Sequence, residues 1–177
     1  MKPVNVHSPP KIDEFRADLA VAVLAGGASR RFGADKALIT LCPDGATLIE
    51  LAVSAGRSVA ADTFVVGHER YAPYLPGVPI VPDDRPGEGP LAGIQAALRF
   101  TSANRVLVLA CDMPCLSTPL LRWMAQIETN ADVLIPRTAD GRWQPMPAIY
   151  SRSAIGSIQN ALDEGNRAVA SFFHTVA

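Results

Sequence analysis

A segment rich in glycine and basic residues follows a short apolar run near the start of the chain. Between Leu24 and Leu38 it holds three glycines, two arginines and a lysine. Glycine allows sharp bends that turn several backbone N–H groups toward one point, where they can bind a phosphate. Arg31 could donate paired hydrogen bonds to phosphate oxygens, and Lys36 could add a single positive charge. This combination favours a triphosphate site over the simpler interpretation, a glycine turn with a solvated basic face.

The spacing of these residues excludes two well-known phosphate-binding motifs. A P-loop needs Gly-Lys-Ser/Thr in succession, but here Asp35 precedes Lys36 and Ala37 follows it. A dinucleotide fingerprint needs G-x-G-x-x-G, which the adjacent Gly26 and Gly27 do not fit. The segment is therefore a phosphate loop of another kind.

A second candidate is Asp112, which lies just after the buried strand expected at residues 105–110. Magnesium prefers oxygen ligands and usually keeps several waters, so one or two carboxylates and the phosphates of a ligand are enough to hold it. The alternative is a turn or helix-capping aspartate ahead of Met113 and Pro114. Position alone supports the two interpretations equally.

The segment between these two candidates, residues 81–94, is rich in glycine, proline and charge. Such a composition is typical of a loop that forms one wall of a ligand site. We expect Asp84, Arg85 and Glu88 to be solvated loop residues. A helix is expected to begin near Pro90, since proline is favoured in a first helical turn.

Buried strands and helices must position these residues. We expect strands at residues 19–25, 64–66, 80–81, 105–110, 133–135 and 148–150, and helices at residues 48–59, 90–98, 117–127 and 155–162. This alternation predicts an α/β fold, a doubly wound, mostly parallel, Rossmann-like sheet with helices on both faces. Because ligands bind at the carboxyl ends of parallel strands, Gly26, Asp83 and Asp112 are expected to lie close together.

Length and composition indicate one folded domain. Of 177 residues, 49% are hydrophobic and 19% charged, and the formal net charge is -1. A chain this close to neutral lacks the broad basic surface that binds nucleic acid, and no apolar run is long enough to cross a membrane. We expect residues 1–18 to form a flexible extension without a signal peptide, and residues 19–177 to form a single domain. The three cysteines are expected to be free thiols, which favours the cytoplasm.

The glycine-rich segment resembles the signature of the molybdenum cofactor guanylyltransferases, LAGG-x-S-x-R-(M/F)-G-x-D-K-A-L. The match runs from Leu24 to Leu38, with Phe32 where methionine is usual. Gly27 follows the guanylyltransferase pattern, whereas related cytidylyltransferases typically carry alanine there. The resemblance spans residues 19–173 and implies an α/β fold of the nucleotide-diphospho-sugar transferase type, with residues 19–177 as one nucleotidylyltransferase domain.

Two further motifs extend this resemblance. Residues 111–114 read C-D-M-P, the metal-binding motif of the family, and residues 89–93 read G-P-L-A-G, which is associated with the guanine-specific members. Asp83 aligns best with an aspartate that contacts GTP in the family, and Asp84 is the adjacent alternative. Gly67 lies near a further nucleotide-contacting position.

The resemblance implies transfer of GMP from GTP to molybdopterin, with release of pyrophosphate. It implies a magnesium ion on Asp112 and catalytic roles for Arg31, Lys36 and Asp112. The implied nucleotide-binding residues are Leu24, Ala25, Gly26, Gly27, Lys36, Gly67, Asp83, Gly89, Pro90, Leu91 and Asp112. Molybdoenzyme apoproteins or cofactor chaperones are the implied protein partners, with neither nucleic acid nor a membrane involved.

The acceptor side of the implied reaction has fewer matching residues. The stretch Trp143–Tyr150 resembles a family segment thought to face the pterin, and a turn feeding a strand is the equally good alternative. Asn166 and Arg167 resemble another segment on the substrate side. Family members usually continue into an N-x-N-T-P-E-D-L segment, whereas the sequence ends at Ala177 without it. We therefore expect these stretches, or another subunit, to bind molybdopterin. A related enzyme using CTP or a sugar phosphate, and a non-catalytic binding module, are the alternative functions.

Overall fold

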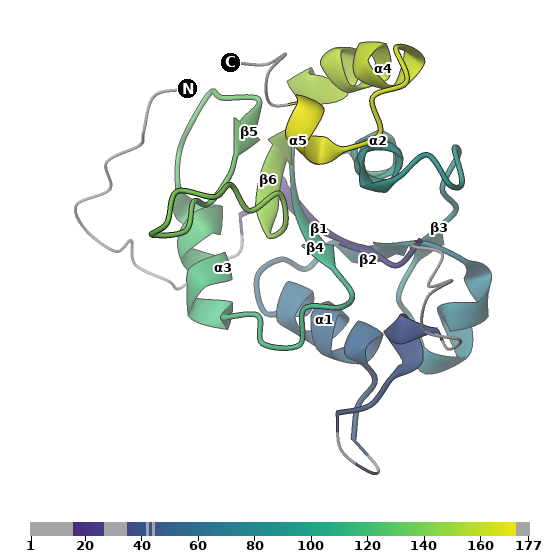
Figure 1. Ribbon diagram of the computed structural model, residues 1–177. Coiled ribbons are helices and arrows are strands. Elements are labelled where there is room, and N and C mark those ends of the chain that lie inside the picture. The colour runs from purple at the N-terminus through teal and green to yellow at the C-terminus, as the bar shows by residue number, and fades with distance from the viewer. Residues whose placement is uncertain (1–15, 27–34, 42, 44, 173–177) are drawn as a thin grey trace.

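The computed structural model describes residues 16–26, 35–41, 43 and 45–172. In these residues six strands form one sheet in the order β3-β2-β1-β4-β6-β5 (Figure 1). The strands are β1 (Leu19–Leu24), β2 (Thr63–Val66), β3 (Ile80–Val81), β4 (Arg105–Ala110), β5 (Val133–Leu134) and β6 (Ala148–Ser151). Strands β3, β2, β1 and β4 run parallel, while β6 is antiparallel to both β4 and β5. The expected mostly parallel α/β sheet is confirmed.

Helices cover both faces of this sheet (Figure 1). The helices are α1 (Leu48–Arg57), α2 (Pro90–Phe100), α3 (Thr118–Gln126), α4 (Ile155–Asp163) and α5 (Val169–Phe172), with 3-10 turns η1 (Lys36–Leu38), η2 (Glu69–Tyr74) and η3 (Arg152–Ala154). One face packs against α2, α4 and α5, and the other against α1 and α3. None of the helices in the described residues is long and apolar enough to cross a bilayer.

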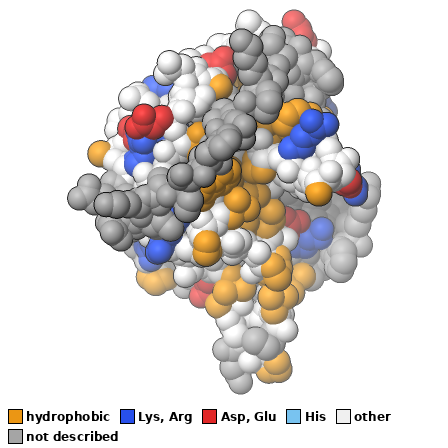
Figure 2. Space-filling view, turned by 90° about the vertical axis from the view of Figure 1, so that its left-hand side faces the viewer, with side chains coloured by type: hydrophobic (Ala, Val, Ile, Leu, Met, Phe, Trp, Pro, Cys, Tyr) orange, Lys and Arg blue, Asp and Glu red, His pale blue; other side chains and the backbone are white. Residues whose placement is uncertain are grey.

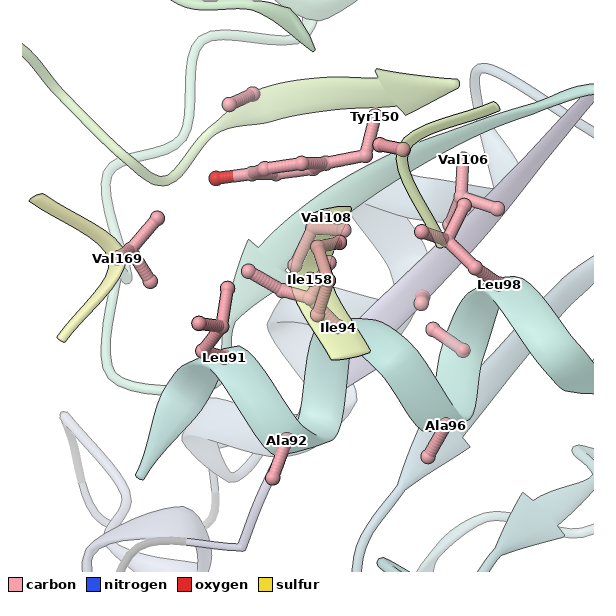
Figure 3. Packing of buried hydrophobic residues seen from close by; sticks show 14 of the residues in the cluster. Leu91, Ala92, Ile94, Ala96, Leu98, Val106, Val108, Tyr150, Ile158 and Val169 are labelled. Carbon is pink, nitrogen blue, oxygen red and sulfur yellow. The ribbon is translucent and has the colours of Figure 1, made fainter. Parts of the chain in front are cut away.

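Strand β1 shows why its residues are apolar without alternation. Ala20 and Ala22 face the layer of α2 and α4, whereas Val21 and Val23 face the layer of α1 and α3. All four are fully buried, so neither face of the strand can carry a polar residue without a buried partner. Figure 3 shows the first of these layers, where Ile94 of α2 lies among side chains of β4 and α4.

Local signals set the helix starts. Thr47 and Glu50 form a reciprocal capping box at the start of α1. Ser117 caps α3 by accepting a hydrogen bond from the backbone N–H of Leu120, as expected. Pro90 occupies the first turn of α2, also as expected.

Strand β6 departs from the parallel arrangement, because it runs antiparallel to both of its neighbours, β4 and β5. The connection between β5 and β6 contains no helix, and a parallel pair would need a long crossover between its strands. The two strands therefore pair antiparallel, with Val133 opposite Tyr150. The parallel part retains its switch in strand order, because β2 and β3 lie on one side of β1 and β4 lies on the other.

The chain before β1 is described only from Arg16. Its guanidinium lies 2.9 Å from Asp18, and its carbonyl accepts a hydrogen bond from the backbone N–H of Leu19. Residues 1–15 lie outside the described residues, so the flexible extension stays a prediction. On the face shown in Figure 2, the basic and acidic side chains of the described residues are scattered among hydrophobic ones.

Candidate active site

A pocket of about 400 Å³ opens at the carboxyl ends of β1 and β4, where the strand order switches. Its size is within the range of small-molecule sites, roughly 300–1,000 Å³. The pocket is lined by Leu24, Ala25, Gly26, Asp35, Lys36, Ala37, Val66, Tyr71, Asp83, Gly87, Gly89, Pro90, Gly93, Ala110, Cys111, Asp112 and Met146. Gly26, Asp83 and Asp112 thus line one cavity. This was predicted because each of them follows a strand of the sheet.

The end of β1 is held rigidly between its two neighbours. The backbone N–H of Cys111 donates to the carbonyl of Leu24 over 3.1 Å, and the N–H of Ala25 donates to Val66 over 2.8 Å. Gly26 is the first exposed residue after this strand. A Cβ atom at Gly26 would lie 3.9 Å from Oδ2 of Asp83, so the Asp83 carboxylate lies directly beside Gly26.

Lys36 enters the pocket at the start of η1. The preceding Asp35 caps this turn by accepting a hydrogen bond from the backbone N–H of Ala37 over 3.2 Å. The same carboxylate forms a 2.7 Å ion pair with Arg70 and lies 3.0 Å from the hydroxyl of Tyr71. Asp35 and Tyr71 were not among the predicted site residues. The position of Asp35 beside Lys36 could have indicated it, whereas no local signal marks Tyr71.

Asp112 is exposed, follows β4 and lines the pocket. The pKa of the neighbouring Cys111 thiol is raised to about 11, chiefly by burial and further by the charges of Asp112 and Asp35. Both carboxylates and Cys111 line the same pocket. No group of three or more metal-ligating side chains occurs among the described residues. A magnesium ion held by one carboxylate, water and ligand phosphates fits this arrangement.

Another wall of the pocket is formed by the loop after β3 and by the start of α2. Asp83 is half-buried, and its Oδ1 accepts a hydrogen bond from the backbone N–H of Arg85 over 2.9 Å. Asp84 is exposed, lies 4.0 Å from Arg99 and does not line the pocket. Of the two adjacent aspartates, Asp83 is therefore the one placed to meet a ligand.

Arg85 and Glu88 are partly exposed loop residues, as expected, but they are also paired in ways that the sequence did not indicate. The Arg85 guanidinium pairs with Asp163 of α4 at 2.8 Å and with Glu88 at 3.4 Å. The contact with Asp163 joins the loop to a helix that is distant in sequence, which local composition does not reveal.

The N-terminus of α2 points into the site through Gly89 and Pro90, both of which line the pocket. The first turn of any helix has backbone N–H groups without intrahelical partners, and it carries a partial positive charge that favours phosphate. Gly89 has a φ of +83°, a conformation that other residues rarely adopt. Its position also lies against the main chain of Arg167.

Some predicted residues lie away from the cavity or outside the described residues. Leu91 is fully buried in the layer between α2 and the sheet, and Gly67 is buried against Ala25. Neither lines the pocket, so any nucleotide contact they make stays a prediction. Gly27 and Arg31 lie outside the described residues.

Only part of the stretch predicted to face the acceptor, residues 143–150, lines the pocket. Met146 lines the pocket, whereas Trp143 is 45% exposed with Arg137 stacked over its ring. The Tyr150 hydroxyl donates to the carbonyl of Pro145 over 3.0 Å. Within this stretch, Met146 is the residue that reaches the site.

A comparison with protein families decides the family of the chain. The profile described as "MobA-like NTP transferase domain" matches residues 21–176, which include every lining residue of the pocket. The chain belongs to the MobA-like NTP transferase family. Its members are nucleotidyltransferases by that description, and the pocket of this family member is built at the switch point of the sheet.

Relatives within the MobA-like family resemble most of the chain. The probable molybdenum cofactor guanylyltransferase of Pelotomaculum thermopropionicum is 34% identical over 154 residues, covering 87% of this chain and 74% of that protein. Its counterpart in Chloroflexus aggregans is 36% identical over 149 residues, covering 82% and 71%. The crystal structure of molybdopterin-guanine dinucleotide biosynthesis protein A from Archaeoglobus fulgidus matches with a TM-score of 0.71 and 30% identity, covering 89% of this chain and 80% of that one.

Proposed function

We propose that this chain transfers GMP from GTP to molybdopterin in the cytoplasm, releases pyrophosphate, and requires magnesium. The observation that carries the proposal is the pocket at the ends of β1 and β4, which brings together a lysine, an exposed carboxylate and a helix N-terminus. These are the groups needed to hold a triphosphate and a cation. The similarity to guanylyltransferases over most of the chain supports guanine as the base and molybdopterin as the acceptor.

Each group has a separate task in this proposal. The backbone at Gly26 and the first turn of α2 would bind phosphate oxygens, and Lys36 would neutralise part of the triphosphate charge. Asp112 would hold magnesium, which supplies positive charge to the reacting phosphates. Asp83, which lies beside Gly26 and lines the pocket, would contact the nucleotide. Arg31, placed by the signature motif, would stabilise the leaving pyrophosphate.

The proposed reaction needs no general base. The terminal phosphate of molybdopterin has a second pKa near ~6, so it is already a dianion in most molecules at neutral pH. It would attack the α-phosphorus of GTP, the bond from that phosphorus to the bridging oxygen would break, and pyrophosphate would leave. His68 is the one histidine in the described residues, and its Nδ1 accepts a hydrogen bond from the backbone N–H of Arg70 over 3.0 Å. It caps η2 and lies outside the pocket lining, so positioning and charge neutralisation would provide the catalysis.

The acceptor would enter beside Met146, the part of the predicted pterin-facing stretch that lines the pocket. The product would pass to molybdoenzyme apoproteins or to cofactor chaperones. The competing functions are transfer from CTP, transfer to a sugar phosphate, and nucleotide binding without catalysis. Lys36 and Asp112 on one cavity favour an enzyme over a binding module.

The test is incubation of the full chain with molybdopterin, magnesium and each of the four nucleoside triphosphates, with products identified by mass spectrometry. The expected product is the GMP adduct of molybdopterin, with one pyrophosphate released for each adduct. A parallel incubation with a sugar 1-phosphate tests the alternative acceptor. A CMP adduct, a sugar nucleotide, or GTP binding without any adduct would each contradict the proposal.

A further inference from the structure

The hydroxyl of Tyr71 contacts two separate residues of the signature segment, Ala25 and Asp35. It lies 3.2 Å from the carbonyl oxygen of Ala25, the residue before Gly26. It also lies 3.0 Å and 3.1 Å from the two carboxylate oxygens of Asp35, the residue before Lys36. Tyr71 belongs to η2, which follows β2, so it reaches these segments from a separate part of the chain.

The chemistry of this contact favours the hydroxyl as a hydrogen-bond donor. Tyr71 is 1% exposed, and burial raises the pKa of its phenol, so the proton is retained at neutral pH. The hydroxyl has a single proton, which it can donate either to Asp35 or to the Ala25 carbonyl, while it accepts from the Arg70 guanidinium over 3.1 Å. Donation to a carboxylate is the stronger of the two because the acceptor is charged.

The Asp35 carboxylate is fully engaged by these partners. One oxygen accepts from the backbone N–H of Ala37, and the other pairs with Arg70 at 2.7 Å. Tyr71 contacts both oxygens. Asp35 is therefore a poor metal ligand although it lines the pocket with Asp112. Its side chain instead caps the turn that begins with Lys36, so any shift of Asp35 would move the lysine.

Arg70 alone could not hold Asp35 as firmly. The Arg70 side chain is 54% exposed, and an ion pair with one partner in solvent adds little rigidity. Tyr71 is anchored in the core between α1 and the sheet, where its ring cannot move without opening a cavity. The buried hydroxyl is thus the fixed point against which Asp35 is held.

We propose that Tyr71 is a positioning residue for the nucleotide site: its hydroxyl holds Asp35 beside the end of β1, in the placement that lets Gly26 and Lys36 bind one triphosphate. This inference rests on the proposed function in taking GTP as the ligand. Tyr71 would act through Asp35 and the β1 end, without touching the nucleotide itself.

The test compares Tyr71→Phe with the wild-type chain in GTP binding and in GMP transfer. Phenylalanine keeps the buried ring and removes only the hydroxyl. We expect the Kd and the KM for GTP to rise about tenfold, while the KM for molybdopterin changes by less than about twofold. Tyr74→Phe is the matched control, because it removes an exposed hydroxyl from the same η2 turn outside the pocket lining, and it should leave both constants unchanged.

A double-mutant cycle tests the route through Asp35. Asp35→Asn keeps an oxygen that can cap Ala37 and removes the charge that Tyr71 and Arg70 hold. If the two residues act as a unit, the double variant will bind GTP about as weakly as the weaker single variant. A Tyr71→Phe chain with wild-type GTP affinity, or one that loses only thermal stability, overturns the inference, as do fully additive effects. Wild-type GTP binding without transfer contradicts the proposed function instead, and the Tyr71→Phe affinity still decides the inference.

Discussion

A Cβ atom at Gly89 would lie 2.8 Å from the carbonyl oxygen of Arg167, so the first turn of α2 rests directly on the chain that follows α4. This contact joins the phosphate-facing helix end to a segment far away in sequence. Glycine is required at this position for two reasons: a side chain would collide with Arg167, and the φ of +83° is one that other residues rarely adopt.

Gly89→Ala should lower both stability and nucleotide affinity. At φ +83° and ψ -176° the backbone is in a region that essentially only glycine occupies, which costs a residue with a side chain on the order of 1–3 kcal/mol, and the close approach to Arg167 adds to that cost. We expect the free energy of unfolding in urea to fall by about 2 kcal/mol or more, and the GTP affinity measured by calorimetry to fall as α2 shifts. Gly77→Ala is the control, because Gly77 has a φ of +72° but nothing within 4 Å of the added atom. A Gly89→Ala chain no less stable than Gly77→Ala would contradict the steric argument.

Asp112→Asn should abolish transfer without harming the fold. The side chain is exposed, so the substitution should change the free energy of unfolding by less than about 0.5 kcal/mol. Loss of the carboxylate should lower the turnover rate on the order of 100-fold or more, because charge stabilisation at the phosphates is lost. The measurement is the rate of adduct formation across a magnesium titration. Normal turnover at low magnesium would remove Asp112 from the mechanism.

Lys36→Ala should weaken GTP binding while the fold is kept. A charge-assisted contact is worth roughly 1.5–3 kcal/mol, which corresponds to about a tenfold to hundredfold rise in Kd. Calorimetry with GTP and magnesium measures this change. Arg57→Ala removes a cation from the end of α1, outside the pocket lining, and should leave the Kd unchanged. Equal effects of the two substitutions would indicate a general charge effect in place of a specific contact.

Asp83→Asn and Asp84→Asn should differ in their effect on the preference for GTP over CTP. Asp83 lines the pocket beside Gly26, whereas Asp84 lies outside it near Arg99. We expect Asp83→Asn to reduce the preference for GTP over CTP in a competition assay, and Asp84→Asn to retain the wild-type preference. The reverse result would show that the rival aspartate contacts the nucleotide.

Cys111 should react slowly with thiol reagents near neutral pH. Its pKa of about 11 means that, at pH 8, roughly one thiol in a thousand is the reactive thiolate. The rate of alkylation should therefore rise about tenfold for each pH unit between pH 8 and 10. In a Cys42→Ser background, mass spectrometry should find iodoacetamide on the exposed Cys115 well before Cys111. Rapid labelling of Cys111 at pH 7 would contradict the burial of its sulfur.

Local sequence patterns determined most of the elements and the place of the site. The strand expected at residues 105–110 matches β4 at both ends, and its residues 106–110 are apolar because the strand is buried on both faces. Ser117 and Pro90 predicted the starts of α3 and α2, since capping and the geometry of proline act within a single turn. Gly26 and Asp112 could be placed together because parallel strands bring their carboxyl ends to one edge.

Only the tertiary structure decided the contacts between distant segments. The direction of β6, the choice of Asp83 over Asp84 as the pocket residue, and the Arg85–Asp163 ion pair all depend on how separate elements pack. Tyr71 lies in a 3-10 turn interrupted by proline, which has no periodicity that could mark a site residue. Its hydroxyl acquires a role because β2 and β1 pair side by side and bring η2 against Ala25 and Asp35. Local propensity sets which residues become strand or helix, whereas such contacts depend on the placement of whole elements, which only the packed core defines.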